Sequence, residues 1–137
     1  MKKEGYEDVP FNVHLTGYIT DENRMADYYN ASDVFVLPSL EENLPNTIME
    51  AMACGTPAVA FNIGGIPDLI DHQQNGYLAE YCNAKDFAAG IKWVLENNER
   101  YQLLSKNARE KTVALYSYSV VAKQYEEVYD SFKSMAT

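Results

Sequence analysis

Two glutamates that lie eight positions apart are the residues of this 137-residue sequence whose type and spacing could do chemistry. They are Glu42 and Glu50, in the segment "SLEENLPNTIMEAMACG". A carboxylate can stabilise positive charge that develops on a reacting group, and it can accept charge-assisted hydrogen bonds from hydroxyl groups. The same two residues could also be a surface charge and a helix cap, and the pair alone does not decide between these roles.

The elements around the pair would place both carboxylates at one edge of a sheet. The run "DVFVLPS" predicts a short strand with both faces buried that ends near Pro38, and residues 45–54 are typical of a helix. Ligands of open α/β sheets bind beyond the carboxyl ends of the strands. The free N–H groups and the dipole at a helix start also suit a phosphate. Residues 39–46 therefore form a candidate anion-binding loop.

Each glutamate has a structural alternative. The segment Thr47 to Glu50 fits a capping box, in which a glutamate side chain returns to the backbone of the helix start. Glu42 follows Glu41, and two neighbouring acidic residues in a loop are typical of an exposed surface. From the pattern alone, both alternatives stay open.

The order of elements predicts a doubly wound α/β fold. Apolar runs alternate with segments of helical periodicity, which is typical of a parallel sheet covered by helices, and three further helices follow. Asp21 is the expected N-cap of the first helix. About ten polar residues precede the first expected strand, so the chain resembles such a domain with its first elements missing. The expected strands are residues 11–17, 33–39, 57–62 and 77–82, and the expected helices are 21–32, 45–54, 66–70, 84–98, 99–116 and 118–135.

Composition and charge exclude several classes of function. Hydrophobic residues make up 47% and charged residues 23%, as expected for one globular domain. No run reaches the ~18 apolar residues of a membrane span, and the opening "MKKEGYEDVP" lacks the apolar stretch of a signal peptide. The net charge is −9, with ten acidic residues and one basic residue between positions 13 and 84, which argues against a nucleic-acid surface.

The metal-binding and thiol residues are few and scattered. Cys54 and Cys82 share no metal-ligand spacing, and we expect both to be reduced thiols in or near the core of a cytoplasmic protein. His14 and His72 are too isolated to form a metal cluster. We therefore expect neither a metal nor a cofactor.

A longer segment, "DVFVLPSLEENLPNTIMEAMACGTPAVAFNIGGIPDLIDHQQNGYLAE", gives the two glutamates a context. It resembles the C-terminal, donor-binding domain of GT-B glycosyltransferases, in particular the retaining family 4 (glycosyl transferases group 1). The resemblance extends over nearly the whole chain, so residues 1–137 are expected to be part of such a nucleotide-sugar-binding domain. Its anchor is the E-x7-E pair of Glu42 and Glu50, which is specific only in this context.

The resemblance implies a reaction and a set of roles. Enzymes of this family transfer a hexose from a nucleotide-diphosphate sugar to an acceptor hydroxyl with retention, without a metal, often in bacterial polysaccharide, capsule or glycolipid synthesis. Glu42 would lie at the reacting centre as the catalytic residue, and Glu50 would bind the ribose. The loop after the first expected strand would approach the base. The remaining donor-binding residues are Asn43, Leu44, Asn46 and Thr47 in the glutamate loop and Tyr18, Ile19, Thr20 and Asp21 near the base.

The sequence departs from the family pattern in two ways. The loop contains "ENLPN" in place of the common glycine-rich "EGFG" form, so that Pro45 removes one N–H donor. The arginine and lysine with which the family clamps the diphosphate have no match, because Lys2 and Lys3 stand in the wrong context and Arg24 is expected on a helix surface. Gly64 and Gly65 could approach a ligand, but a tight turn is the interpretation we favour.

These observations leave three functions open. The first is a donor domain of a longer glycosyltransferase, inactive by itself, whose N-terminal acceptor domain belongs to the same polypeptide. The second is a non-catalytic nucleotide- or sugar-binding module, and the third is a scaffold of the same fold. The first would place the enzyme in the cytoplasm, alone or at the inner face of the membrane. An unpartnered apolar face on the last helix, at Val120, Val121, Tyr125, Val128 and Tyr129, would then favour self-association of the isolated chain.

Overall fold

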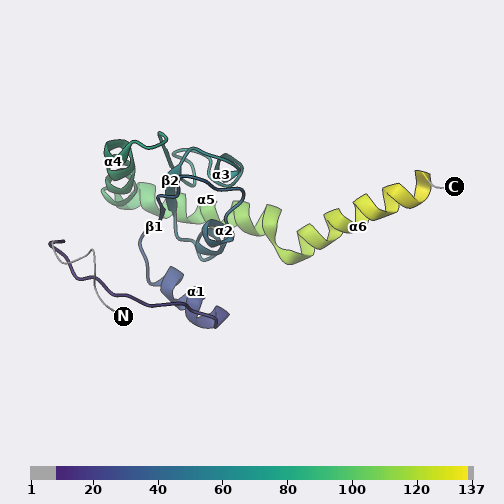
Figure 1. The fold of residues 1–137 in the computed structure, drawn as a ribbon, viewed down its shortest axis with the longest axis horizontal. Coiled ribbons are helices and arrows are strands. Elements are labelled where there is room, and N and C mark those ends of the chain that lie inside the picture. Colours follow the sequence, from purple (N-terminus) through teal and green to yellow (C-terminus); the bar gives the residue numbers. More distant parts are fainter. Residues whose placement is uncertain (1–8, 136–137) are drawn as a thin grey trace.

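The computed structural model describes residues 9–135, and in this range three parallel strands form the sheet (Figure 1). The strands lie in the order β1-β2-β3, with Phe35 opposite Ala58 and Ala58 opposite Gly76. The strands are β1 (Phe35–Leu37), β2 (Ala58–Phe61) and β3 (Gly76–Ala79), and the helices are α1 (Glu22–Asn30), α2 (Asn46–Ala53), α3 (Ile66–Leu69), α4 (Ala84–Leu95), α5 (Asn98–Tyr116) and α6 (Tyr118–Met135).

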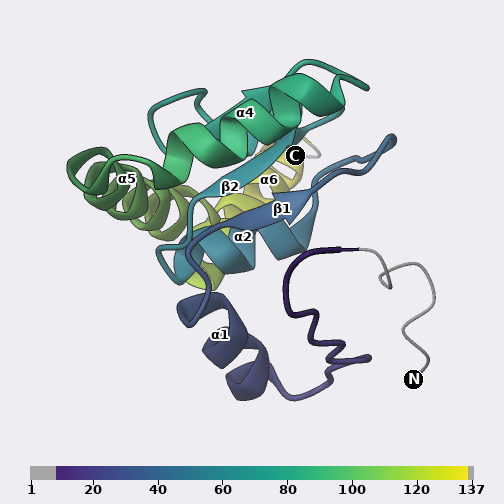
Figure 2. The same cartoon turned by 90° about the vertical axis from the view of Figure 1, so that its left-hand side faces the viewer.

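The central strand β2 has both of its faces buried. Helices cover both faces of the sheet (Figure 2), and all four residues of β2 are buried. Ala58 and Ala60 belong to a core cluster with residues of α2, α3 and α5, whereas Val59 and Phe61 belong to a second cluster with Phe87 and Val94 of α4. This two-sided cover is the doubly wound architecture that the alternation of elements predicts.

Most of the local structure agrees with the sequence signals. The Asp21 side chain caps α1 by accepting a hydrogen bond from the backbone N–H of Arg24 at 3.0 Å. Asn83 and Asn97 cap α4 and α5 in the same way. Gly55, whose φ is +81°, follows α2 at the expected stop signal.

Two expected features of the strands are wrong. Residues 11–17 form no strand, and the side chain of Val36 in β1 is 40% exposed, so β1 is not buried on both faces. In the described range the sheet has the order β1-β2-β3, and no strand pairs with residues 11–17. A strand without a hydrogen-bonded neighbour is not stabilised by its own propensity.

The cysteines and histidines also differ in part from expectation. Cys54 is partly buried, and burial raises the pKa of its thiol, but Cys82 is exposed in the turn after β3. The interpretation of Cys82 as a near-core thiol is therefore wrong. The Nδ1 atom of His72 accepts a hydrogen bond from the backbone N–H of Leu78 at 3.1 Å, which gives this side chain a structural role.

The last helix leaves the body of the molecule. In Figure 1, α6 extends away from the layers that enclose the sheet, after a break at Ser117. Tyr125, Val128, Tyr129 and Phe132 are each more than half exposed along it. Within residues 9–135, none of the helices is both long enough and apolar enough to cross a membrane.

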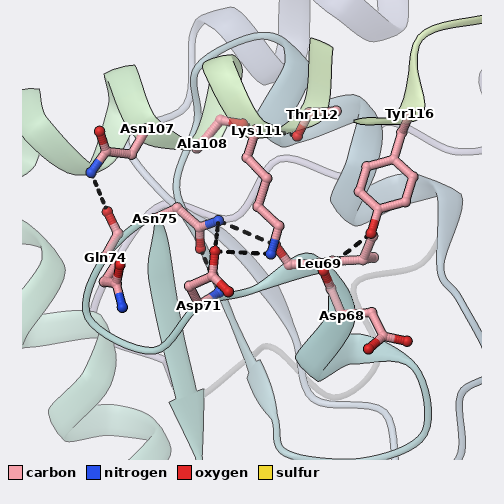
Figure 3. Close-up of polar contacts among 10 residues, drawn as sticks. All are labelled: Asp68, Leu69, Asp71, Gln74, Asn75, Asn107, Ala108, Lys111, Thr112 and Tyr116. Atoms are coloured by element: carbon pink, nitrogen blue, oxygen red, sulfur yellow. Dashed lines mark hydrogen bonds and ion pairs between the residues drawn. The ribbon is translucent and has the colours of Figure 1, made fainter. Parts of the chain in front are cut away.

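A polar cluster joins α5 to the segment between α3 and β3 (Figure 3). The Nζ atom of Lys111 lies 2.9 Å from the Oδ2 atom of Asp71. The buried Asn75 side chain accepts a hydrogen bond from the Asp71 N–H and donates one to the Leu69 carbonyl. Tyr116 donates to the carbonyl of Asp68. This cluster secures α5 to the end of the sheet where β3 begins.

Replacing Lys111 should therefore destabilise the chain more than replacing an exposed lysine on the same helix. The Lys111 side chain is 18% exposed, whereas Lys106, which pairs with Glu110, is 67% exposed. We expect Lys111→Met to lower the free energy of unfolding by about 1–2 kcal/mol, because it leaves Asp71 without its cation. Lys106→Met should change it by less than about 0.5 kcal/mol. Urea denaturation measures both, and equal losses would contradict this role of Lys111.

Candidate functional site

The glutamate loop and the start of α2 lie at the carboxyl edge of the sheet, where the sequence places them. β1 ends at Leu37, and α2 begins at Asn46 after the loop. Pro45 is the N-cap residue of α2, and no side chain makes a capping hydrogen bond there. The first N–H groups and the positive end of the helix dipole are thus directed to this edge.

The capping-box alternative for Glu50 is wrong. Because α2 begins at Asn46, Glu50 is the fifth residue of the helix and lies beyond the reach of the box. Its Oε2 atom instead accepts a hydrogen bond from the hydroxyl of Tyr29 at 3.0 Å. The Glu50 carboxylate is therefore directed toward α1 and not toward the backbone of its own helix.

A pocket of about 350 Å³ lies between α1 and α2. Glu50 lines it from one side, and Ile19, Thr20 and Asp21 line it from the other. The structure thus brings together four of the expected donor-binding residues from segments about 30 positions apart in the sequence. The other lining residues are Glu22, Met25, Ala26, Tyr29, Ala53, Cys54 and Tyr118.

The other expected residues lie outside this pocket. Asn46 shares a second hollow of about 360 Å³ with Glu50, next to the junction of α5 and α6. Asn43, Leu44 and Thr47 are exposed along the loop and the first turn of α2. Tyr18 is 94% exposed and does not line the pocket. The expected role of Asp21 in donor binding is limited by the fold, because its carboxylate already accepts the capping hydrogen bond of α1.

Glu42 is partly buried, and its backbone is held by the turn before α3. Gly65 donates its N–H to the carbonyl of Asn43 at 2.6 Å. A Cβ atom on Gly64 would lie 1.9 Å from the Glu42 carbonyl oxygen, and one on Gly65 would lie 2.4 Å from that of Asn43. The two glycines form the expected tight turn, and they also let that turn contact the glutamate loop closely.

Positive charge is sparse around the site. Arg24 is exposed on α1, where its guanidinium lies 6.0 Å from the centre of the Tyr28 ring. Arg109 of α5 donates to the carbonyl of Ala53 at the far end of α2. Lys2 and Lys3 lie outside the described residues. No arginine or lysine lines the 350 Å³ pocket in the part of the chain that the structure describes.

Metal ligands do not gather at the site either. In residues 9–135, no three His, Cys, Asp or Glu side chains form a group that could hold a metal ion. The polar side chains that line the 350 Å³ pocket are carboxylates, hydroxyl groups and the Cys54 thiol.

Sequence reasoning missed Tyr29. The tyrosine lies 21 positions from Glu50, and its place in the helical periodicity of α1 indicates only a core residue. The tyrosine side chain is 7% exposed, and burial together with the hydrogen bond to Glu50 raises its pKa. The hydroxyl group therefore keeps its proton and acts as a donor.

The fold and this edge site define a Rossmann-like domain of the GT-B glycosyltransferase class. The profile of the family described as "Glycosyl transferases group 1" matches residues 6–111. The chain belongs to this family.

Individual relatives agree with this assignment. An uncharacterized glycosyltransferase from Haemophilus influenzae is 38% identical over 93 residues, which are 67% of this chain and 26% of that protein. Sucrose-phosphate synthase from Thermosynechococcus elongatus is 32% identical with a TM-score of 0.76, over 82% of this chain and 28% of that one. Anabaena HepE in complex with UDP-glucose is 26% identical with a TM-score of 0.73, and the match covers 78% of this chain and 30% of that chain. The chain thus spans less than a third of the length of these relatives.

The contact between the glycine turn and the glutamate loop can be tested through stability. Gly64 and Gly17 both have positive φ values, +52° and +68°, but a Cβ on Gly17 meets nothing within 4 Å. Gly17→Ala should cost about 1–2 kcal/mol of unfolding free energy from backbone strain alone. Gly64→Ala should cost about 1–3 kcal/mol more, because its methyl group displaces the Glu42 backbone. Equal losses in urea denaturation would show that the turn and the loop do not depend on each other.

Proposed function

We propose that residues 1–137 form part of the donor-binding domain of a longer glycosyltransferase. The complete enzyme transfers a hexose from a nucleotide-diphosphate sugar to an acceptor hydroxyl with retention of configuration. The observation that carries the proposal is the pocket between α1 and α2 that Glu50 shares with the segment Ile19 to Asp21. The relative HepE, whose structure was determined with UDP-glucose, supports a nucleotide-sugar as the ligand.

In this proposal the nucleotide lies across α1 and α2. The Glu50 carboxylate accepts hydrogen bonds from the ribose hydroxyls, and the base lies against the loop of Tyr18 to Asp21. The diphosphate faces the helix start, where the N–H groups of Asn46 and Thr47 and the helix dipole favour an anion.

Glu42 lies close to the donor sugar and acts on the reacting centre. Breaking the bond between sugar and phosphate builds positive charge on the sugar ring and negative charge on the leaving diphosphate. A carboxylate beside the ring stabilises the first, and the N–H groups of the loop, including those of Asn43 and Leu44, stabilise the second. The contact of Gly64 with the Glu42 carbonyl holds this residue in place.

The remainder of the enzyme supplies what these residues lack. An N-terminal acceptor domain of the same polypeptide and the first strands of this domain would contribute the cations that clamp the diphosphate. Without them we expect residues 1–137 to bind nucleotide-sugar weakly and to have no transferase activity. The exposed apolar residues of α6 support a contact with that missing part in the complete enzyme, and self-association of the isolated chain. The enzyme acts in the cytoplasm, with the acceptor either in solution or at the inner membrane surface.

A non-catalytic binding module of the same fold is the second candidate. The sparse positive charge around the pocket favours it only if no other part of the protein supplies cations, because a transferase must stabilise its leaving diphosphate. Activity assays of the complete protein with UDP- and GDP-sugars separate the two functions. Turnover supports the transferase, and binding of the nucleotide-sugars without turnover supports the module.

The two glutamates should affect different steps of the reaction. In the complete enzyme, Glu42→Ala should lower kcat by about 100-fold or more with a small change in donor affinity, because it removes charge stabilisation in the transition state. Glu50→Ala should weaken nucleotide binding by about 10- to 100-fold, the loss of one or two charge-assisted hydrogen bonds.

The neighbouring loop carboxylate provides the control for this experiment. Glu41 is exposed beside Glu42. Glu41→Ala should therefore leave kcat and the affinity for the nucleotide within about twofold of the values of the unaltered protein. Steady-state kinetics and calorimetric titration with the nucleoside diphosphate measure these effects. Normal kcat and normal affinity in both the Glu42 and Glu50 variants would refute the assignment of the site.

A further inference from the structure

The hydroxyl of Tyr29 is fixed in place before it meets Glu50. The tyrosine ring packs edge-on against Phe35, with 5.7 Å between the ring centres. The Oγ1 atom of Thr56 donates a hydrogen bond to the Tyr29 carbonyl at 2.7 Å, which ties the end of α1 to the segment before β2. The aromatic contact and the backbone contact leave the Tyr29 side chain little freedom, so its hydroxyl is a fixed donor.

The Glu50 side chain, in contrast, is not fixed by packing. It is an exposed side chain on a surface turn of α2, and such a side chain samples several rotamers in solution. Among the described residues, its carboxylate accepts a side-chain hydrogen bond from Tyr29 alone, through Oε2. A carboxylate offers about four acceptor positions, so one bond to Oε2 leaves Oε1 and part of Oε2 available to a ligand.

We propose that Tyr29 is a positioning residue that selects the Glu50 rotamer needed to accept hydrogen bonds from the vicinal hydroxyls of a ribose. This inference rests on the proposed function, because it assumes that Glu50 binds the nucleotide. The hydroxyl holds one carboxylate oxygen at the wall of the pocket, and the other oxygen faces the ligand. Binding then requires less ordering of Glu50, and reduced ordering raises affinity without any contact between Tyr29 and the ligand.

A merely structural role for Tyr29 makes a different prediction. If the Tyr29–Glu50 hydrogen bond serves only to join α1 to α2, its loss weakens the binding of every ligand of the pocket by the same factor. A positioning role acts through the ribose hydroxyls. Loss of the Tyr29 hydroxyl should therefore weaken the binding of nucleotides that carry these hydroxyls and leave the binding of nucleotides that lack them unchanged.

The test uses Tyr29→Phe in the complete protein with two ligands. The first is UDP or GDP, whichever binds more tightly, and the second is its 2′,3′-dideoxy analogue. We expect Tyr29→Phe to weaken binding of the ribonucleotide by about three- to tenfold, in the range of one hydrogen bond to a charged group partly replaced by water. Affinity for the dideoxy analogue should stay within about twofold. The phenylalanine keeps the ring contact with Phe35, so the variant should fold.

Tyr77→Phe is the matched control. The Tyr77 hydroxyl donates to the Oδ1 atom of Asp86 at 2.8 Å, so this variant loses the same kind of tyrosine–carboxylate bond in a place that does not line the pocket. It should leave the affinity for both ligands unchanged. The positioning role would be overturned if Tyr29→Phe weakened the binding of both ligands equally, or weakened the binding of neither.

Glu50→Gln separates a failure of this inference from a failure of the proposed function. If Glu50 binds the ribose, the Glu50→Gln variant loses most of its preference for the ribonucleotide over the dideoxy analogue. If that preference persists in Glu50→Gln, the ribose is bound elsewhere, and both the proposed site and the role of Tyr29 are wrong. If Glu50→Gln loses the preference but Tyr29→Phe keeps it in full, the site stands and only the positioning role is wrong.

Discussion

The structure depends on the burial of β2. Its four residues are enclosed on both faces and pair in parallel with β1 and β3, so the carboxyl ends of all three strands lie at one edge. Each return of the chain to the other edge requires a helix, and each helix covers one face of the sheet. The loop with Glu42 and the start of α2 consequently lie where open α/β sheets bind their ligands.

Two contacts then hold the glutamates in place. The turn at Gly64 and Gly65 holds the backbone next to Glu42, and the hydroxyl of Tyr29 holds the carboxylate of Glu50. The contact of the turn with the glutamate loop requires glycines, because a Cβ atom would not fit there. The contact with Glu50 requires the buried hydroxyl of Tyr29 as a hydrogen-bond donor. Neither contact brings a cation against either carboxylate.

The sequence predicts the parts of this arrangement that depend on local signals. Periodicity and caps locate every helix to within a few residues, and Asp21 is the N-cap as expected. The sequence does not predict the non-local contacts. Residues 11–17 have the pattern of a strand but pair with no strand among the described residues, and Thr47 to Glu50 has the pattern of a capping box although α2 begins two residues too early for it. The bond from Tyr29 to Glu50 joins two helices and has no local signal.

The central claim is that a nucleotide lies across α1 and α2 at the carboxyl edge of the sheet. The most direct measurement is an NMR titration of the 15N-labelled chain with UDP and with GDP, which follows each backbone amide. The account predicts that one of the two nucleotides shifts the amides of Tyr18 to Asp21 and of Asn46 to Glu50, and leaves those of α4 and α6 unchanged. Shifts confined to α4 or α6, or spread evenly over the chain, would contradict it.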